Sequence, residues 1–353
     1  MYYVKPTIKN IERIPQPENR GKYIRLDQNE NPDGIPEWLY EKVVSKMTPE
    51  YLSIYPEEDI FTEKFADFLK IKKENVTMCD GSVVGMGYIF KVFGEKGKNL
   101  ICVTPTFGMY KAYAEMEEMN TIQVSYESDY TFKIENILNK IDSNTGIVVL
   151  VNPNMPMGNV YSQDEIIKVV EKAQKNNAIV IIDEAYYYFY DKTSLELINK
   201  YDNVILLRTF SKILSIPSLR MGAIISNPAL IKYINNYKPH YTVNSIALLF
   251  GEEIINNFDR LYKELHEKFE EGKNYLVSEL EKNSYEYINS YGCFLCIKPK
   301  KYSSEEITQK LKEKNILILC GKGDLTGFLR VTIWGKKYME IFMNALLEIE
   351  NEN

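Results

Sequence analysis

The chain has 353 residues, of which 45% are hydrophobic and 26% charged, and this composition is that of an ordinary soluble globular protein with about two domains. The net charge of −6 gives no reason to expect nucleic acid or an anionic membrane as a partner. No apolar run approaches the roughly 20 residues of a membrane span, and the N-terminus lacks the apolar core of a signal peptide. The five scattered cysteines indicate reduced thiols in a cytoplasmic protein, and no histidine, cysteine and carboxylate cluster has metal-ligand spacing.

The first two thirds of the chain alternate between strand and helix patterns after a polar, proline-rich arm. Helices are expected over 37–47, 60–69, 83–93, 109–119 and 163–176, and strands over 75–78, 100–103, 121–126, 146–151, 178–182, 204–207 and 223–225. Such alternation predicts an α/β fold with a mostly parallel sheet and helices on both faces.

The last third predicts a smaller α+β unit. A long helical pattern covers 245–283, followed by strands near 294–297, 316–319 and 329–333 and by helices over 304–314 and from 338 onward. We therefore expect three parts: an N-terminal arm (1–36), a large domain (37–250), and a linking helix with a small C-terminal domain (251–353).

Ligands of parallel α/β sheets bind where the strands end, so the polar turns after these strands should converge on one site. Asp80-Gly81-Ser82-Val83 precedes a helix, whose first N–H groups can hold a phosphate. Beyond the strand at 204–207 come Thr209, Ser211, Lys212 and Arg220, which suit an anionic ligand. A desolvated lysine also has a lowered pKa and a nucleophilic amine.

Two further turns complete this chemistry. Asp183 ends a buried strand, so it is either a turn former or a buried carboxylate that needs a cation, such as a protonated ring nitrogen. Tyr110 brings an aromatic ring that can stack on a flat heterocycle or simply pack in the core. A phosphate site, a flat ring, a pyridinium and a reactive lysine together describe pyridoxal phosphate.

These residues lie in motifs by which the chain resembles, over nearly its whole length, the fold-type I pyridoxal-phosphate aminotransferases of class I/II, in particular the histidinol-phosphate aminotransferase-like group. The motifs are Asn29-Glu-Asn-Pro32, Tyr55-Pro56-Glu57, Asp80-Gly-Ser82, Pro105-Thr-Phe-Gly-Met-Tyr110, Asn152-Pro-Asn-Met-Pro-Met-Gly158, Asp183-Glu-Ala-Tyr186, Thr209-Phe-Ser-Lys212, Leu219-Arg-Met-Gly222 and Leu329-Arg-Val-Thr332. Their shared order and spacing carry the resemblance.

The resemblance implies a homodimeric enzyme with pyridoxal 5'-phosphate as its cofactor and a small molecule as its substrate. Lys212 would be the Schiff-base lysine and move the Cα proton, Asp183 would keep the ring nitrogen protonated, and Tyr186 would hydrogen-bond the ring oxygen. The other cofactor-binding residues would be Gly81, Ser82, Val83, Tyr110, Asn154, Thr209, Ser211, Arg220 and, from the partner subunit, Tyr55. Arg330, Asn29 and Glu30 would bind the substrate, where the Arg330 guanidinium suits a carboxylate or phosphate.

One motif departs from the family. The usual loop reads Asn-Pro-Asn-Asn-Pro-Thr-Gly, and its last asparagine contacts the ring oxygen, but this chain has Met155 there and Met157 in place of the threonine. Our hypothesis is that Tyr186 alone holds that oxygen, which alters the pKa of the bound cofactor.

Two reactions stay open. The first is amino transfer from a donor such as glutamate to a small, phosphorylated oxo compound, although the arm (Ile14-Pro-Gln-Pro17) lacks the aromatic expected to contact histidinol phosphate. The second is decarboxylation of phosphoserine or phosphothreonine, because Ser215-Ile-Pro-Ser-Leu-Arg220 resembles a segment of threonine-phosphate decarboxylases. A DNA-binding regulator and a nicotinamide dehydrogenase are disfavoured, since the chain has neither a basic helix-turn-helix pattern nor the glycine fingerprint.

Overall fold

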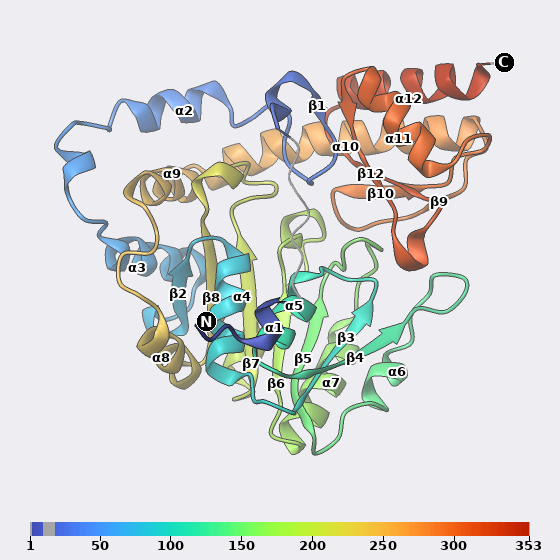
Figure 1. Ribbon diagram of the computed structural model, residues 1–353. Helices are drawn as coiled ribbons and strands as arrows, with labels where there is room; N and C mark the ends of the chain where they lie inside the picture. Colours follow the sequence, from blue (N-terminus) through green and yellow to red (C-terminus); the bar gives the residue numbers. More distant parts are fainter. Residues whose placement is uncertain (1, 10–17, 353) are drawn as a thin grey trace.

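The computed structural model describes residues 2–9 and 18–352 and contains a central sheet of seven strands (Figure 1). In chain order these are β2 (Val76–Cys79), β3 (Asn99–Thr104), β4 (Asn120–Ser125), β5 (Thr145–Val151), β6 (Ile179–Asp183), β7 (Val204–Thr209) and β8 (Gly222–Ser226). Their spatial order is β2-β8-β7-β6-β5-β3-β4, and β8 runs antiparallel to both of its neighbours while the other pairs are parallel. The prediction of a mostly parallel sheet is therefore confirmed.

The strands are apolar at successive positions because both faces of the sheet are covered. In β5, Ile147 and Val149 face one apolar core, whereas Val148 and Leu150 face the other. The first core contains side chains of α4 (Ser82–Phe93), α5 (Met109–Met116) and α8 (Pro228–Tyr237), and the second those of α3 (Glu58–Leu69), α6 (Ile134–Leu138), α7 (Gln163–Lys175) and α9 (Ser245–Asn256). Sheet and helices thus form a three-layer unit whose strand ends are free to carry polar groups.

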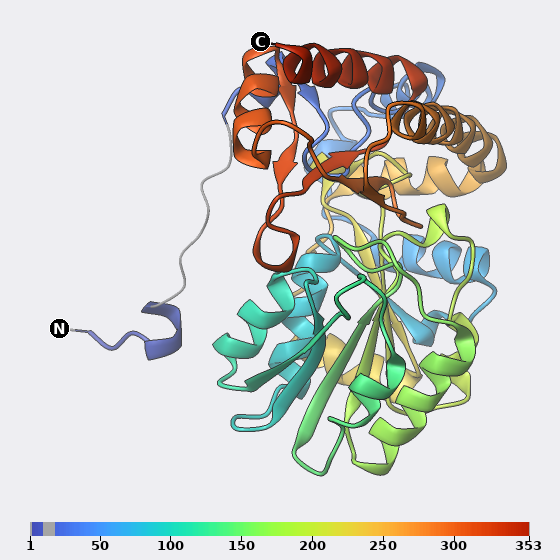
Figure 2. The ribbon, with the colours of Figure 1, turned by 90° about the vertical axis from the view of Figure 1, so that its right-hand side faces the viewer.

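A smaller unit lies above this sheet in Figures 1 and 2. It contains α10 (Phe258–Lys282), α11 (Ser304–Glu313), α12 (Lys336–Asn351) and a sheet ordered β12 (Leu319–Cys320), β13 (Leu329–Thr332), β10 (Phe294–Ile297) and β9 (Tyr287–Ile288). Gly272 lets α10 touch the chain beside α12, because a Cβ there would meet the Trp334 carbonyl oxygen at 2.0 Å.

The arm is anchored on this smaller unit. The arm contains α1 (Pro6–Lys9) and β1 (Ile24–Arg25), and it is followed by α2 (Glu37–Val44). Strand β1 pairs in parallel with β11 (Ile316–Leu317) of the smaller unit. Leu26 is fully buried, and its N–H donates to the Leu317 carbonyl at 2.8 Å. The predicted division at residues 36 and 250 stays a prediction, and Ile14-Pro-Gln-Pro17, where we noted a missing aromatic, lies outside the described residues.

The structure differs from the expected elements most clearly between 245 and 283. The expected single helix is two, α9 and α10, which meet at Asn257, where the backbone leaves the helical region at φ −124°, ψ 26°. The Asn257 side chain donates to the Glu253 carbonyl at 2.7 Å, the kind of local bond by which asparagine interrupts helices. In the described ranges, no helix is long and apolar enough to cross a membrane.

Candidate active site

Asp183 and Lys212 are brought together by two neighbouring strands. Asp183 is the last residue of β6, Lys212 follows the end of β7, and β6 pairs with β7. The buried Asp183 carboxylate accepts hydrogen bonds from the Tyr110 hydroxyl at 2.7 Å and from the Ala185 N–H at 2.9 Å. Burial nevertheless raises the pKa of the Asp183 carboxyl from 3.8 to about 6. A buried carboxylate held this way is suited to a cationic ligand.

This raised pKa makes a testable prediction for the cofactor-free protein. Between about pH 4 and pH 6 the folded chain holds a proton on Asp183 that the unfolded chain has lost, so stability should fall as the pH rises through this window. The isosteric Asp183→Asn variant should lack this part of the slope, worth up to about 3 kcal/mol. Urea midpoints at half-unit pH steps measure it, and parallel curves for the two proteins would contradict it.

The Lys212 amine lies between the arm and Tyr186. Its Nζ donates to the Gln28 carbonyl at 3.1 Å and lies 5.7 Å from the centre of the Tyr186 ring. Burial lowers the pKa of Lys212 and the Arg330 charge acts in the same direction, so the neutral, nucleophilic amine is easier to form.

The Tyr186 hydroxyl is held by the arm. Tyr186 is buried, and its oxygen accepts a hydrogen bond from Asn29 Nδ2 at 2.8 Å. Asn29 in turn bonds to Thr332 on β13. The structure thus uses the Asn29 amide to bind protein groups, and its predicted contact with substrate stays a prediction.

A cradle for an anion lies at the start of α4. Gly81 has φ +81°, and a Cβ there would meet the Arg220 guanidinium at 2.3 Å. Gly222 lies equally close to the Ser82 N–H, since a Cβ on it would approach that nitrogen to 2.5 Å. The buried Ser211 hydroxyl has no hydrogen-bond partner within the described chain. A helix N-terminus, a guanidinium and an unsatisfied hydroxyl fit a phosphate group.

The remaining predicted cofactor residues have these surroundings. Val83 follows in the first turn of α4, and the Thr209 hydroxyl accepts from the Ser211 N–H at 3.1 Å, which shapes the loop. Tyr110 is fully buried, and its stacking on the cofactor stays a prediction. The Asn154 amide bonds to Thr106 at 2.7 Å, to the Pro105 carbonyl and to Tyr126, so its hydrogen-bonding groups are already used within the loops.

Arg330 is a buried cation with spare donors. Its Nη2 donates to the Asp27 carbonyl, its Nη1 lies 3.1 Å from the Met155 sulfur, and its buried Nε has no partner among the residues described. Such a guanidinium fits an incoming carboxylate or phosphate. Glu30, also predicted to bind substrate, pairs with Arg20 and with Arg25, and its contact with substrate stays a prediction.

A buried ion pair that the sequence analysis missed supports the Asp183–Tyr186 turn. Arg208 Nε and Nη2 donate to the Glu184 carboxylate at 3.0 and 2.9 Å, and both side chains are at least 95% buried. Glu184 also accepts from the Ser194 N–H, and the guanidinium covers the Tyr187 ring. The signal was an arginine inside a buried strand pattern, which needs a carboxylate partner.

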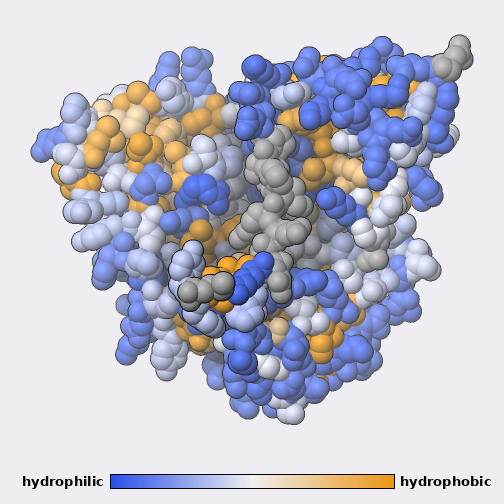
Figure 3. All heavy atoms as spheres, in the orientation of Figure 1, coloured by the Kyte–Doolittle hydropathy of each residue, from blue (hydrophilic) through white to orange (hydrophobic). Residues whose placement is uncertain are grey.

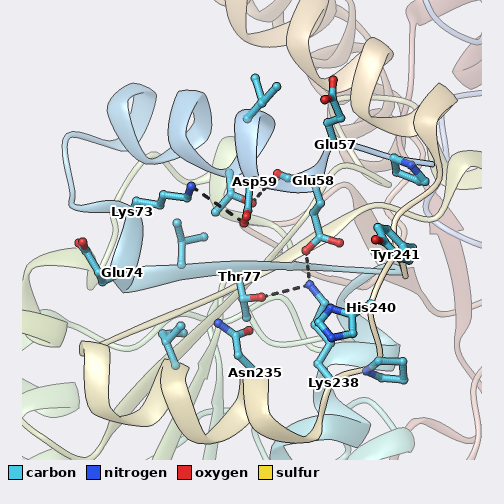
Figure 4. A pocket seen from close by; sticks show the side chains of 16 residues that line it. Glu57, Glu58, Asp59, Lys73, Glu74, Thr77, Asn235, Lys238, His240 and Tyr241 are labelled. Atoms are coloured by element: carbon cyan, nitrogen blue, oxygen red, sulfur yellow. Dashed lines mark hydrogen bonds and ion pairs between the residues drawn. The ribbon is translucent and has the colours of Figure 1, made fainter. Parts of the chain in front are cut away.

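A pocket of about 650 Å³ lies apart from this cluster, between α3 and the end of α8 (Figure 4). Four acidic side chains line it, and Lys238 in its wall bonds to Glu58 and Thr77. Tyr241 on its rim stacks on Tyr55, a predicted partner-site residue that is 74% exposed, with ring centres 4.8 Å apart.

Known proteins resemble this chain in sequence over nearly its whole length. The sequence model described as aminotransferase class I and II matches residues 21–346. The histidinol-phosphate aminotransferase of Caldanaerobacter subterraneus subsp. tengcongensis is 30% identical over 96% of this chain and 95% of its own, and that of Pyrococcus furiosus is 30% identical over 94% of each.

Solved structures share the fold. The histidinol-phosphate aminotransferase of Sinorhizobium meliloti, in complex with pyridoxal-5'-phosphate, has a TM-score of 0.88 at 20% identity and covers 99% of this chain and 98% of its own. The L-threonine-O-3-phosphate decarboxylase of Porphyromonas gingivalis has a TM-score of 0.79 at 19% identity and covers 93% of this chain and 100% of its own. The chain belongs to the aminotransferase class I and II family and is a pyridoxal-phosphate-dependent aminotransferase of fold type I.

Proposed function

We propose that the enzyme moves an amino group from an amino acid, glutamate, to a small phosphorylated oxo compound. The observation that carries the proposal is the position of Arg330, whose buried Nε is unpaired within the described chain and whose charge acts on Lys212. A substrate acid held by this guanidinium would be placed beside the lysine that does the chemistry. The histidinol-phosphate aminotransferases at 30% identity support a phosphorylated acceptor.

Each part of the cofactor has a matching group in the chain. Gly81, Ser82, Ser211 and Arg220 would hold the phosphate, Asp183 the ring nitrogen and Tyr186 the ring oxygen, and Lys212 would provide the point of attachment. The bound cofactor supplies an electron sink for the carbon that loses its proton.

The residues of the chain then divide the remaining tasks. Lys212, with its lowered pKa, would take the proton from the substrate Cα and pass it to the cofactor carbon that receives the amino group. Asp183 would keep a proton on the ring nitrogen of the cofactor, because the ion pair would offset the cost of burying the carboxylate. Arg330 fixes the substrate acid, so that the Cα proton points toward Lys212.

We also propose a homodimer in which Tyr55 reaches the cofactor of the partner subunit. Tyr55 is 74% exposed, and apolar neighbours on the same segment, Leu52, Ile54 and Ile60, are at least 51% exposed. Figure 3 shows apolar side chains gathered on this side of the molecule, near α2 and α3. Exposed apolar groups of this kind favour a protein interface.

Decarboxylation is the alternative. The fold shared with the Porphyromonas gingivalis decarboxylase supports it, and so does the segment Ser215–Arg220, in which Arg220 lies against Gly81. Both reactions need the same lysine and acid-binding arginine and differ in which Cα bond is oriented for cleavage.

One measurement separates the two reactions. When holoenzyme is mixed with glutamate in the absence of an acceptor, amino transfer should release about one 2-oxoglutarate per site, as quantified by mass spectrometry. Release of carbon dioxide from phosphothreonine or phosphoserine, with no 2-oxoglutarate from glutamate, would overturn the proposal in favour of the decarboxylase.

A further inference from the structure

The Tyr186 hydroxyl belongs to a hydrogen-bond chain that ends on the strand of Arg330. Asn29 Nδ2 donates to the Tyr186 oxygen at 2.8 Å, and the Thr332 hydroxyl donates to Asn29 Oδ1 at 3.1 Å. Tyr186 is 4% exposed, Asn29 3% and Thr332 0%, so water does not compete for these bonds.

Thr332 determines which group donates in each hydrogen bond of this series. The Thr332 oxygen accepts the Asn29 backbone N–H at 3.0 Å, so the Thr332 proton is directed to Asn29 Oδ1. That bond turns the Asn29 NH₂ group toward Tyr186. Because an NH₂ group only donates, the Tyr186 oxygen must accept there, and its own proton remains available for another acceptor.

Met155 makes the proton of the Tyr186 hydroxyl important in this protein. Met155 stands where the family has an asparagine on the ring oxygen, and its sulfur lies against Arg330 Nη1 at 3.1 Å. A thioether has no proton to donate. Of the two side chains that the family places on the ring oxygen, only Tyr186 then has a proton to donate.

The same strand also holds the arm on which Asn29 lies. The Thr332 N–H donates to the Leu26 carbonyl at 2.9 Å, and Arg330 donates to the Asp27 carbonyl. Thr332 and Arg330 are two residues apart on β13 and so face the same side of it. The position of Asn29 therefore depends on the strand that carries the substrate-binding arginine.

We propose that Asn29 and Thr332 are positioning residues for the reaction, which direct the Tyr186 proton to the cofactor ring oxygen and link that hydrogen bond to the strand of Arg330. This gives Asn29 a role different from the substrate contact expected from its motif. The proposal rests on the cofactor site of the proposed function, but its test reads the resting holoenzyme, so an error in the substrate class would leave it unaffected.

The experiment is a spectrophotometric pH titration of the bound cofactor. The group that titrates is the nitrogen through which Lys212 would be attached to the cofactor. A hydrogen bond to the ring oxygen favours the form in which this nitrogen has lost its proton, so removing the bond should raise the titration midpoint. We expect Tyr186→Phe to raise it by about one pH unit or more, and Thr332→Val, which removes only the hydroxyl, by about half a unit. Thr332→Ser should restore the native midpoint.

Asn29→Asp provides a second test if Thr332→Val is unstable. A carboxylate only accepts, so it would take the Tyr186 proton for itself, and the left-handed backbone of Asn29 (φ 55°) tolerates aspartate. We expect a midpoint shift close to that of Tyr186→Phe.

Two comparisons decide the outcome. In a Tyr186→Phe background, Thr332→Val and Asn29→Asp should produce no further shift, because both act through the missing hydroxyl. Thr145→Val serves as the control and should leave the midpoint unchanged. It removes a buried hydroxyl bonded to Asp142 at the start of β5, the end of the strand away from the site. An unshifted midpoint in the single variants, or shifts that persist without the Tyr186 hydroxyl, would overturn the proposal.

Discussion

Replacing Lys212 by alanine is expected to lower kcat at least about a thousandfold, because the variant loses both the attachment point of the cofactor and the base that moves the Cα proton. The phosphate cradle at Gly81, Ser211 and Arg220 does not depend on Lys212, so the variant should still bind the cofactor. Single-turnover release of 2-oxoglutarate measures the first effect, and equilibrium dialysis of the cofactor measures the second.

The matched control is Lys232→Ala, which removes an exposed lysine from α8 and should leave kcat unchanged. If Lys212→Ala retained turnover within tenfold of the native rate, the assignment of the whole site would be refuted. A variant that lost cofactor binding together with turnover would instead mean that attachment to Lys212 is needed to retain the cofactor and that the phosphate cradle alone does not hold it.

The second large effect concerns stability. Arg208→Met should lower the free energy of unfolding by about 3–5 kcal/mol, because it leaves the buried Glu184 carboxylate without its cation. Urea unfolding of the cofactor-free protein measures the change. The double variant with Glu184→Gln should recover part of the loss, since no unpaired charge then remains in the interior.

An exposed ion pair serves as the comparison. Lys200 and Glu196 lie 2.9 Å apart with more than half of each side chain exposed, so Lys200→Met should cost less than about 0.5 kcal/mol. If Arg208→Met and Lys200→Met lowered the free energy of unfolding by the same amount, the Arg208–Glu184 pair would not support the fold.

Much of the large unit could be predicted from the sequence because its signals are local. The continuous apolar strands, such as Val204–Leu207, reflect burial on both faces, and Asp183 and Lys212 come next to each other because neighbouring parallel strands end at one edge. The helix break at Asn257 was not predicted, because the segments on both sides have a helical pattern. The feature that marks the break is the hydrogen bond from the Asn257 side chain to the Glu253 carbonyl, which a sequence pattern does not show.

The contacts that position the site were not predictable in the same way. Thr332 lies 303 residues after Asn29, and no periodicity or motif relates the two positions. The bonds of the Asn154 amide to Thr106 and Tyr126 depend on how three loops meet, and its expected contact with the cofactor stays a prediction. Side-chain direction in loops follows from tertiary packing, which a local pattern does not contain.

The attachment of the arm to the last strands has a consequence for protein synthesis. The ribosome delivers about 5–20 residues per second, so Asn29 emerges roughly a quarter of a minute to a minute before Thr332, 303 residues later. Until β11 is made, Leu26 has no strand to bond to, and until Lys212 is made, 184 residues after Gln28, the Gln28 carbonyl has no amine to accept from. The active site therefore becomes complete only after β13 has been made, so the arm reaches its native position later than the large domain that follows it in the sequence.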